Sequence, residues 1–393
     1  MAVKSRARRF PNSSKAEYRQ LGCRSGLMQE LSFSFRPAGP GSALEPVWRD
    51  LESRSDCSFF LSWDWIGCWL DEIDARPILV EGRAGDAVVV LGVFCPGAAR
   101  PFAIRSVRLQ ETGQAEADSL YIEYNGLLID RRWAGIGERL CIEALLAEGA
   151  RRGRAGWDRI VIGAAAEPVV AALRDVQPKP RLEAPIQTSH VDLAAIRAAG
   201  GDYLAAISAN TRYQIRRARR LYEARGPLTL DVARDGEEAQ AYFDALRVLH
   251  QATWTARGRP GAFASPFFVR FHRHLIASGL PNDAVELVRI SAGGAPVAYL
   301  YNFLYRGTVY YYASGIAYEP DNKARPGLLS HAMCIAHHLA RGDDCYDFMA
   351  GAARYKESLG TPGPAISTII VERAGIRSML AGAMRGFRER IRG

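Results

Sequence analysis

The sequence predicts an α/β (α+β) protein built from two similar domains, and three observations carry that prediction. The chain has 393 residues, of which 48% are hydrophobic, and this exceeds what one typical domain needs. Strand-like and helix-like segments alternate in both halves. A Pro- and Gln-bearing stretch at residues 177–187 (QPKPRLEAPIQ) separates the halves. We therefore expect two domains, each with a mixed central sheet flanked by helices.

The first predicted domain spans residues 41–185 and follows a basic, Pro/Gly-containing start. Residues 1–40 predict a mobile basic N-terminal arm. An aromatic-rich segment predicts a helix, and short apolar runs bounded by polar residues predict strands. In chain order we expect a helix at 59–73, strands at 76–83, 87–94 and 121–130, a helix at 131–153 and a strand at 158–164.

The second predicted domain spans residues 186–372. It repeats the alternation of strands and helices of the first domain, which indicates a duplication at the level of the fold. We expect helices at 208–225 and 237–254, strands at 228–233, 285–290, 296–305 and 308–318, a helix beginning near residue 326 and a strand at 345–351. Residues 373–393 have apolar residues at helical spacing with arginines between them. They predict a basic amphipathic helix that docks on its own domain or lies on an anionic membrane surface.

Net charge limits the kinds of partner, and cysteine usage indicates the cellular compartment. The formal net charge of +9 indicates an anionic partner, either a nucleic acid, an anionic membrane or a phosphorylated cofactor. The seven cysteines are scattered without C-x-x-C spacing and predict reduced thiols. No signal-like segment or uninterrupted apolar run of about 18 residues occurs. We expect a cytoplasmic protein, free or peripheral on the cytoplasmic membrane face.

A glycine motif lies where the first half passes from a predicted strand into a predicted helix. It reads R-x-x-G-x-G from Arg132 to Gly137, with Gly135 between them. Two glycines let backbone amides at a helix start approach a pyrophosphate, and the arginine adds charge. The motif resembles the acyl-CoA pyrophosphate loop of the GNAT superfamily of N-acetyltransferases. An ordinary strand-to-helix turn is the alternative.

The second half carries a longer series of motifs. In order they are a basic helix with Arg212, Arg216 and Arg217, then LRVLHQATWTARG, TVYYYASGIAY, ARPGLLSHAM and YDFMAGAARYKESLG. This order resembles the FemAB-like branch of the GNAT superfamily, also called BioF2-like or CelD-like, over roughly residues 59–372. The resemblance implies two tandem GNAT-like domains and an acyl-CoA cosubstrate, with no metal. It also implies a primary amine of an amino sugar or a lipid as acceptor.

The same resemblance implies catalytic roles around the segment YDFMAGAARYKESLG. Asp347 would lie near the acceptor, while Tyr355 and Lys356 would lie at the mouth of the site. A tyrosine hydroxyl can protonate a leaving thiolate, and a lysine is suited to a phosphate. The alternatives are a structural strand carboxylate for Asp347 and a surface charge for Lys356.

His250 and Trp254 form a further candidate pair in HQATW. The imidazole of His250 could take a proton from an attacking ammonium, or the ring could simply pack under Trp254. His331, His337 and His338 share a predicted helix, but the sequence shows no third ligand or H-E-x-x-H pattern, so we expect no metal.

The cosubstrate has two possible binding places. Lys323 and Arg325, with the free amide of Gly327 near a helix start, are candidates in the second half, but that half lacks R-x-x-G-x-G. This departure is equally compatible with a charged-tRNA donor or with a cofactor bound at Arg132 to Gly137.

Other polar and aromatic positions are candidates for binding the second substrate. Glu123 and Tyr124 end an otherwise apolar predicted strand, where a substrate could be held or solvent met. Arg212 and Arg216 either bind phosphate or form a solvated face. Tyr311 lies in an aromatic strand that is compatible with an acyl channel or with a core.

Together these features predict a GNAT-type N-acyltransferase that uses acyl-CoA and acts on an amino sugar of an exopolysaccharide or on a sphingoid or other lipid amine. Two alternatives stay open. One is a Fem-type aminoacyl transferase using charged tRNA, and the other is a non-catalytic accessory protein of polysaccharide biosynthesis. Apart from tRNA in the first alternative, we expect no nucleic-acid partner, because no recognised nucleic-acid module accompanies the basic helix.

Overall fold

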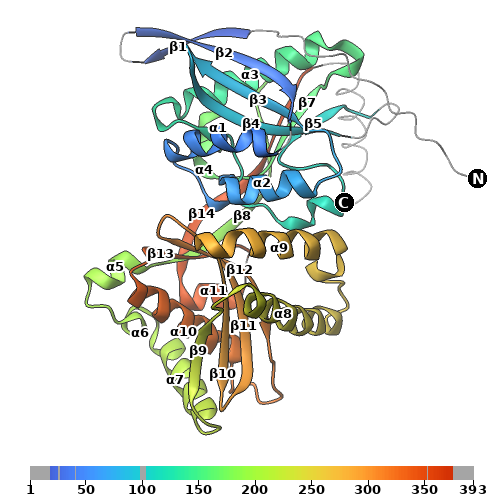
Figure 1. The fold of residues 1–393 in the computed structure, drawn as a ribbon. Coiled ribbons are helices and arrows are strands. Elements are labelled where there is room, and N and C mark those ends of the chain that lie inside the picture. The colour runs from blue at the N-terminus through green and yellow to red at the C-terminus, as the bar shows by residue number, and fades with distance from the viewer. Residues whose placement is uncertain (1–17, 25–26, 40, 98–102, 352, 375–393) are drawn as a thin grey trace, which may run out of the picture.

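The computed structural model describes residues 18–24, 27–39, 41–97, 103–351 and 353–374. Its strands join into one 14-stranded mixed sheet that runs through both halves. In Figure 1 the two halves form separate lobes, and the strands β8 and β14 run from one to the other. The order across the sheet is β1-β2-β3-β4-β5-β7-β14-β8-β13-β12-β11-β10-β9, with β6 paired to β4.

The first half supplies one end of this sheet. Its strands are β1 (Tyr18–Arg24), β2 (Leu27–Pro37), β3 (Ile78–Ala84), β4 (Ala87–Pro96), β5 (Ser106–Leu109), β6 (Leu128–Ile129) and β7 (Arg159–Ala165). Its helices are α1 (Gly41–Ser53), α2 (Trp63–Glu72), α3 (Ile136–Arg151) and α4 (Glu167–Ala172), with short 3-10 turns at 59–61, 117–120, 131–133 and 153–155. The predicted helices and strands of this half are thus found, except for the strand at 121–130.

The second half supplies the other end. Its strands are β8 (Arg181–Asp192), β9 (Leu228–Val232), β10 (Val285–Ala292), β11 (Ala295–Tyr305), β12 (Thr308–Ile316), β13 (Cys345–Ala350) and β14 (Thr361–Glu372). Its helices are α5 (Leu193–Ala198), α6 (Tyr203–Ala206), α7 (Ala209–Glu223), α8 (Gly236–Ala256), α9 (Pro266–Gly279), α10 (Pro326–Arg341) and α11 (Arg354–Leu359). Each predicted helix and strand of this half has a counterpart.

Three sequence interpretations need correction. The predicted mobile arm is wrong for residues 27–37, because β2 pairs with β3 and buries Leu31 and Phe33. The predicted boundary at 177–187 is partly a strand, since β8 starts at Arg181. The second domain was expected to end with residue 372, yet β14 also pairs antiparallel with β7 of the first half. The predicted C-terminal helix lies almost entirely outside the described residues, as does the start of the arm.

The predicted strand at 121–130 is the fourth correction. Only Leu128 and Ile129 pair with β4. Tyr121 and Tyr124 have φ values of 49° and 51°, in the left-handed region that a pleated strand cannot accommodate. Residues 121–124 therefore leave the sheet of the first half, where Asn125 still bridges to Ala165 of β7, and they reach the second half.

A shared hydrophobic core joins the halves. Phe59 and Phe60 of the first half are fully buried, and Phe59 stacks on Phe303 of β11 at a centroid distance of 4.4 Å. Helix α9 packs on α2 at this junction (Figure 1). Apolar burial contributes about 25 cal/mol per Å², so a continuous aromatic core fixes the relation of the two halves.

Candidate active site

Strands β12 and β13 run parallel and pair over a short length only. The ladder covers Thr308–Tyr310 against Cys345–Asp347, and no pairing follows between the described residues of these two strands. Tyr311 and the residues after it therefore have no ladder partner on the β13 side. A diverging pair of parallel strands leaves backbone groups available to an extended ligand. We call this divergence the β12–β13 opening.

Side chains from both halves meet beside this opening. The Tyr124 hydroxyl donates to Asp347 Oδ2 at 2.7 Å. The Ala350 amide, at the end of β13, donates to Glu123 Oε2 at 2.7 Å. Lys356 Nζ donates to the Ala350 carbonyl at 2.6 Å. The structure thus brings together Glu123, Tyr124, Asp347 and Lys356, which we call the junction cluster.

The backbone at the end of β13 is shaped for this cluster. Met349 has a φ of 61°, and the register of β13 against β8 shifts between Asp347 and Ala350. A left-handed conformation at a non-glycine residue costs roughly 1–2 kcal/mol and is kept only where surrounding contacts enforce it. Here the Met349 amide donates to Asp347 Oδ1 at 2.6 Å. The bend turns the Ala350 amide toward Glu123.

Burial shifts the proton affinities of the cluster. Desolvation raises the pKa of Glu123 to about 7, against the lowering effects of the Ala350 amide and Lys356. Desolvation also raises the pKa of Asp347, although Tyr124 and the Met349 amide hydrogen-bond to it. It lowers the pKa of Lys356, against the opposing effects of Glu123 and Asp347. A carboxyl with a pKa near neutrality is suited to general-base catalysis.

The two carboxylates of the cluster differ in their availability. Both oxygens of Asp347 accept hydrogen bonds, from the Met349 amide and from Tyr124. Among the described residues, Glu123 accepts a hydrogen bond on one oxygen only, from the Ala350 amide. Asp347 therefore orients Tyr124 and the backbone, and Glu123 is the better placed proton acceptor. Lys356 is 8% exposed and bonded to backbone carbonyls, which differs from the mobile phosphate ligand that the sequence suggested.

An aromatic group lies next to the junction cluster. Tyr355 stacks on His331 of α10 at 5.1 Å with an interplanar angle of 8°, and Tyr311 packs edge-on against the same imidazole at 4.5 Å. Burial, together with Tyr311, raises the pKa of Tyr355 well above its usual value. Burial and the charge of Lys356 lower the pKa of His331 to about 3. Tyr355 is thus a protonated phenol and His331 a neutral ring at neutral pH.

His250 and Trp254 form a separate pair on α8. The indole N–H of Trp254 donates to His250 Nε2 at 2.9 Å, and the imidazole also packs edge-on against Phe263 at 4.8 Å. Burial lowers the pKa of His250. Because its Nε2 lone pair is engaged by Trp254, this histidine is a weaker candidate base than Glu123. Its hydrogen bond and ring contacts are with Trp254 and Phe263, which lie outside the junction cluster.

The glycine motif of the first half lies at the start of α3. Gly135 has a φ of 83°, and its amide donates to Glu138 Oε2 at 2.6 Å, closing a capping interaction within the helix. A Cβ on Gly137 would approach Val90 at 3.2 Å, so this glycine serves packing on β4. Arg132 is bonded to Asp130 at 2.8 Å. The charges and one amide of this loop are therefore already engaged within the protein.

The start of α10 is less engaged by contacts within the protein than the start of α3. Arg325 has a φ of 44° at the N-cap position and supplies no side-chain cap, and Pro326 occupies the first turn. A Cβ on Gly327 would meet only Ile316, at 4.0 Å. Lys323 and Arg325 are exposed. An uncapped helix start with nearby cations and little steric obstruction can receive a phosphate.

Arg212 and Arg216 line a shallow groove on α7. The groove has a volume of about 360 Å³ and is also lined by Ala209, Tyr213, Arg219 and Arg220. Arg212 donates to the Leu204 carbonyl at 3.0 Å. Among the described residues, no carboxylate is paired with Arg216. The groove is a separate cationic surface, because its lining does not include the junction cluster.

Sequence reasoning missed two positions on β8. His190 lies opposite Asp347 in the β8–β13 ladder, and Thr188, which is 2% exposed, lies opposite Ala350. Both follow the stretch that the sequence indicated as a domain boundary. The polar run from Gln187 to His190, between Ile186 and Val191, has no period-2 alternation, so it gave no strand signal.

Comparison with known proteins agrees with this architecture. Residues 209–357 match the acetyltransferase (GNAT) domain family. The solved structure of FemX covers 89% of this chain and 99% of its own, with 11% identity and a TM-score of 0.57. L-PGS from Bacillus licheniformis covers 87% and 96%, with 13% identity and a TM-score of 0.51. No curated protein matches the sequence.

A further solved structure has the same fold. The C-terminal domain (DUF2156) of an Agrobacterium fabrum protein described as a lysylphosphatidylglycerol synthetase covers 87% of this chain and 94% of its own, with 11% identity and a TM-score of 0.52. The chain thus shares the fold of these proteins, and its second half contains a GNAT domain. This match agrees with the resemblance that the motifs carried.

Proposed function

We propose that the protein is an N-acyltransferase that moves an acyl group from a CoA thioester to a primary amine, at the opening between β12 and β13. The observation that carries this proposal is the junction cluster, in which Glu123 of the first half and Lys356 of the second half share one buried site. Each half by itself holds only part of the acid–base group. The site is therefore composite.

Each proton transfer of the proposed reaction can be assigned to a named group. An ammonium acceptor gives a proton to the Glu123 carboxylate, and the free amine attacks the thioester carbonyl carbon. The tetrahedral intermediate collapses to the amide as its C–S bond breaks. The Tyr355 phenol gives its proton to the departing sulfur, and the second proton of the amine nitrogen, released as the amide forms, restores the phenol. The protein contributes mainly by holding the reactants in line, which is the largest effect in such transfers.

We place the donor pyrophosphate at the start of α10. Helix α3 satisfies its own first turn through Glu138, and Arg132 is engaged by Asp130, whereas the start of α10 has no side-chain cap. Lys323 and Arg325 add positive charge there. A helix N-terminus of this kind carries a partial positive charge, and each favourable anion contact adds typically 0.3–1 kcal/mol.

The acceptor is an amino sugar or a lipid amine in this proposal. A second candidate donor is charged tRNA. The cationic groove on α7 favours it, since exposed arginines with few counter-charges suit a polyanionic backbone. The similarity in fold to FemX is compatible with either donor.

Thermal unfolding of the purified protein with acetyl-CoA, palmitoyl-CoA and free CoA tests the proposal. A ligand at 100 times its Kd adds about 2.7 kcal/mol of stability by mass action. We expect a rise in Tm with a CoA thioester that Lys323→Ala reduces and the matched control Arg132→Ala retains. A long-chain preference would indicate a lipid product.

Three results would contradict this assignment. A Tm rise that Arg132→Ala abolishes would move the donor to the first half. No response to any thioester, with a response to charged tRNA, would replace the donor class. No response to either ligand would favour a non-catalytic accessory role.

A further inference from the structure

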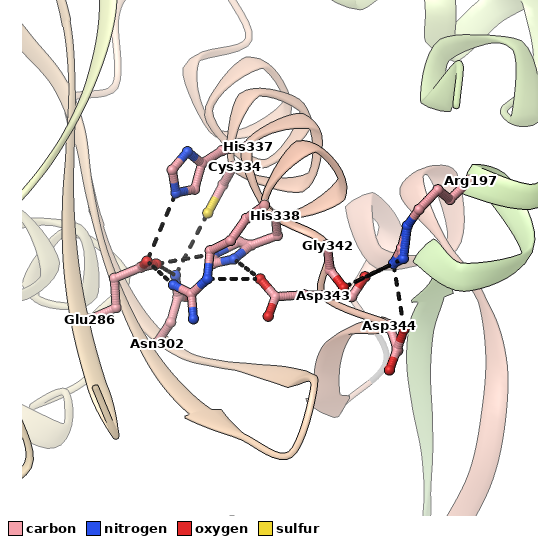
Figure 2. Close-up of polar contacts among 10 residues, drawn as sticks. Arg197, Glu286, Asn302, Cys334, His337, His338, Gly342, Asp343 and Asp344 are labelled. Atoms are coloured by element: carbon pink, nitrogen blue, oxygen red, sulfur yellow. Dashed lines mark hydrogen bonds and ion pairs between the residues drawn. The ribbon is translucent and has the colours of Figure 1, made fainter. Parts of the chain in front are cut away.

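We infer that the C-terminal end of α10 and the strand β10 form a binding site for a divalent cation of the zinc type, held by Glu286, His337 and His338. One ligand atom from each of the three residues lies within 4.8 Å of the others. Figure 2 shows the two histidines of α10 approaching the Glu286 carboxylate. The sequence showed only the two histidines, and β10 supplies the third ligand.

The distances are close to those of a coordination shell. His338 Nε2 lies 3.1 Å from Glu286 Oε2, and His337 Nε2 lies 4.0 Å from Glu286 Oε1. Tetrahedral bonds of about 2 Å separate neighbouring ligand atoms by roughly 3.3 Å. Both pairs reach this separation with shifts of less than about 1 Å, which side-chain rotation supplies.

The neighbours of His338 fix which nitrogen faces the site. Asp343 Oδ2 lies 2.8 Å from His338 Nδ1, so the carboxylate accepts that N–H and turns Nε2 toward Glu286. The imidazole is fully buried, and its Nε2 faces the Glu286 carboxylate at 3.1 Å. Against the lowering effect of burial, hydrogen bonds to Asp343, Cys334 and Glu286 raise the pKa of His338 to about 11, so a metal ion would take the place of the Nε2 proton. A carboxylate behind a histidine is the usual support of a metal-bound imidazole.

A hydrogen bond from a neighbouring side chain orients Glu286 as well. Asn302 Nδ2 donates to Glu286 Oε2 at 3.0 Å, and Glu286 is 3% exposed. His337 has a side-chain exposure of 33%, so this side of the cluster meets solvent and offers an entry path and room for a water ligand. Two ligands are thus buried and oriented, while the third borders water.

Charge and ligand type select the cation. Two imidazoles and one carboxylate suit Zn²⁺, whereas Mg²⁺ and Ca²⁺ prefer sets of oxygen ligands. Arg341 is the competing cation, since its Nη1 lies 3.2 Å from Glu286 Oε1. Its side chain is 40% exposed and its Nε also faces Asp343 at 3.4 Å, so it can keep the Asp343 contact while a metal takes Glu286.

The inferred site is distinct from the acyl-transfer site. The acyl donor is placed at the first turn of α10, and His337 and His338 lie in its last turns. A metal there would tie α10 to β10 and would act on stability rather than on the chemistry. This role requires no change in the proposed reaction, and the two proposals can fail independently.

The test uses the full-length protein without an affinity tag, stripped with a chelator and titrated with Co²⁺ and then Zn²⁺. We expect one ion per chain, with the visible absorption of tetrahedral Co²⁺ and displacement by Zn²⁺. His338→Gln and Glu286→Gln should each weaken binding at least about tenfold. His337→Gln, at a partly exposed position that tolerates change, should do the same.

His274→Gln is the matched control. His274 on α9 also lies beside a carboxylate, with its Nδ1 3.1 Å from Glu72 Oε1, but has no second histidine. It should bind Co²⁺ as the wild type does. Binding that survives His337→Gln, or a wild-type protein that binds no ion under these conditions, would overturn the inference. A Tm rise with Zn²⁺ that Asp343→Asn reduces would support it further.

Discussion

At the scale of single residues, the decisive feature is the buried carboxyl group of Glu123. Burial suits this group to act as a base but makes its ionised form less stable in the fold. Burial raises the pKa of Glu123 to about 7 because desolvation outweighs its hydrogen bond from the Ala350 amide and the nearby charge of Lys356. An ordinary glutamate titrates near 4.3. The same desolvation that makes Glu123 a base at neutral pH makes its ionised form costly to the fold.

The first prediction concerns catalysis by Glu123. Below its pKa the carboxyl is protonated and cannot accept a proton, so kcat/KM should rise with pH and level off above about 7. Glu123→Gln should lower kcat/KM by roughly 10²- to 10⁴-fold and remove this acidic limb. A pH profile of both proteins measures this. An unchanged limb in Glu123→Gln would assign the base to another group.

The second prediction concerns stability. The folded-state pKa of Glu123 is raised, so the native state binds more protons than the unfolded state between the two pKa values. Stability therefore falls as pH rises from about 4.5 to about 7. Glu123→Gln, which cannot ionise, should be more stable than wild type by about 3 kcal/mol well above pH 7, with the difference vanishing near pH 4. Urea unfolding at several pH values tests it. A constant difference would contradict the linkage.

Lys356 gives the third prediction. Its ammonium group bonds the carbonyls of Ala350 and Met349 and lowers the pKa of Glu123. Lys356→Met should destabilise the protein by about 1–3 kcal/mol, because buried carbonyls lose their donor. It should also move the acidic limb of the pH profile upward. Lys179→Met, at a site outside the cluster, is the control and should change neither quantity.

At the scale of elements, helix α10 is the part that links the inferred sites. Its first turn follows Arg325 in a left-handed conformation, and its last turns carry His337 and His338. Gly342, with a φ of 100°, ends the helix. The helix starts with a strained residue and without a side-chain cap, which is the arrangement that a bound anion would stabilise.

The fourth prediction follows from that strain. Arg325→Gly removes a Cβ from a left-handed position and should raise the stability of the unliganded protein by up to about 1 kcal/mol. The same change removes a cation and should weaken CoA binding. Opposite signs in Tm and in affinity, measured by unfolding and calorimetry, are the signature. Loss of both stability and affinity would show instead that the Arg325 side chain stabilises the fold through its own contacts.

At the scale of the whole molecule, the two lobes share one sheet and a hydrophobic core at their junction. The junction core includes Phe59, Phe60 and Phe303, and β14 contributes Ile369 and Val371 to the core of the first half. β14 lies between β7 and β8, so the C-terminal strand completes the sheet of the N-terminal lobe. Among the described residues, no helix is long and apolar enough to cross a membrane.

The fifth prediction concerns this cooperativity. Phe303→Ala should cost about 3–5 kcal/mol, since it opens a cavity in the junction core. Six of the seven tryptophans lie in the first half, so their fluorescence reports mainly on that lobe. We expect fluorescence and far-UV circular dichroism to follow one transition in wild type and variant. Two separate transitions would show that the lobes unfold independently.

Local sequence patterns predicted most helices and strands and the family resemblance. Hydrophobic periodicity placed most helices and strands, and the segment from Asp347 to Lys356 carried the resemblance, because these signals depend only on residues near one another in the chain. The same patterns misjudged residues 121–125 and β8, where left-handed backbone and long-range pairing override local preference.

Tertiary structure alone decided how the sites are composed. The sequence marked Glu123 and Lys356 separately, but only folding puts both in one buried cluster, and their pKa values depend on the desolvation that packing imposes. The pairing of β14 with β7, and of Glu286 with His338, likewise joins segments far apart in the chain. Sequence spacing is short-ranged, whereas strand register and electrostatic environment are set by the whole fold.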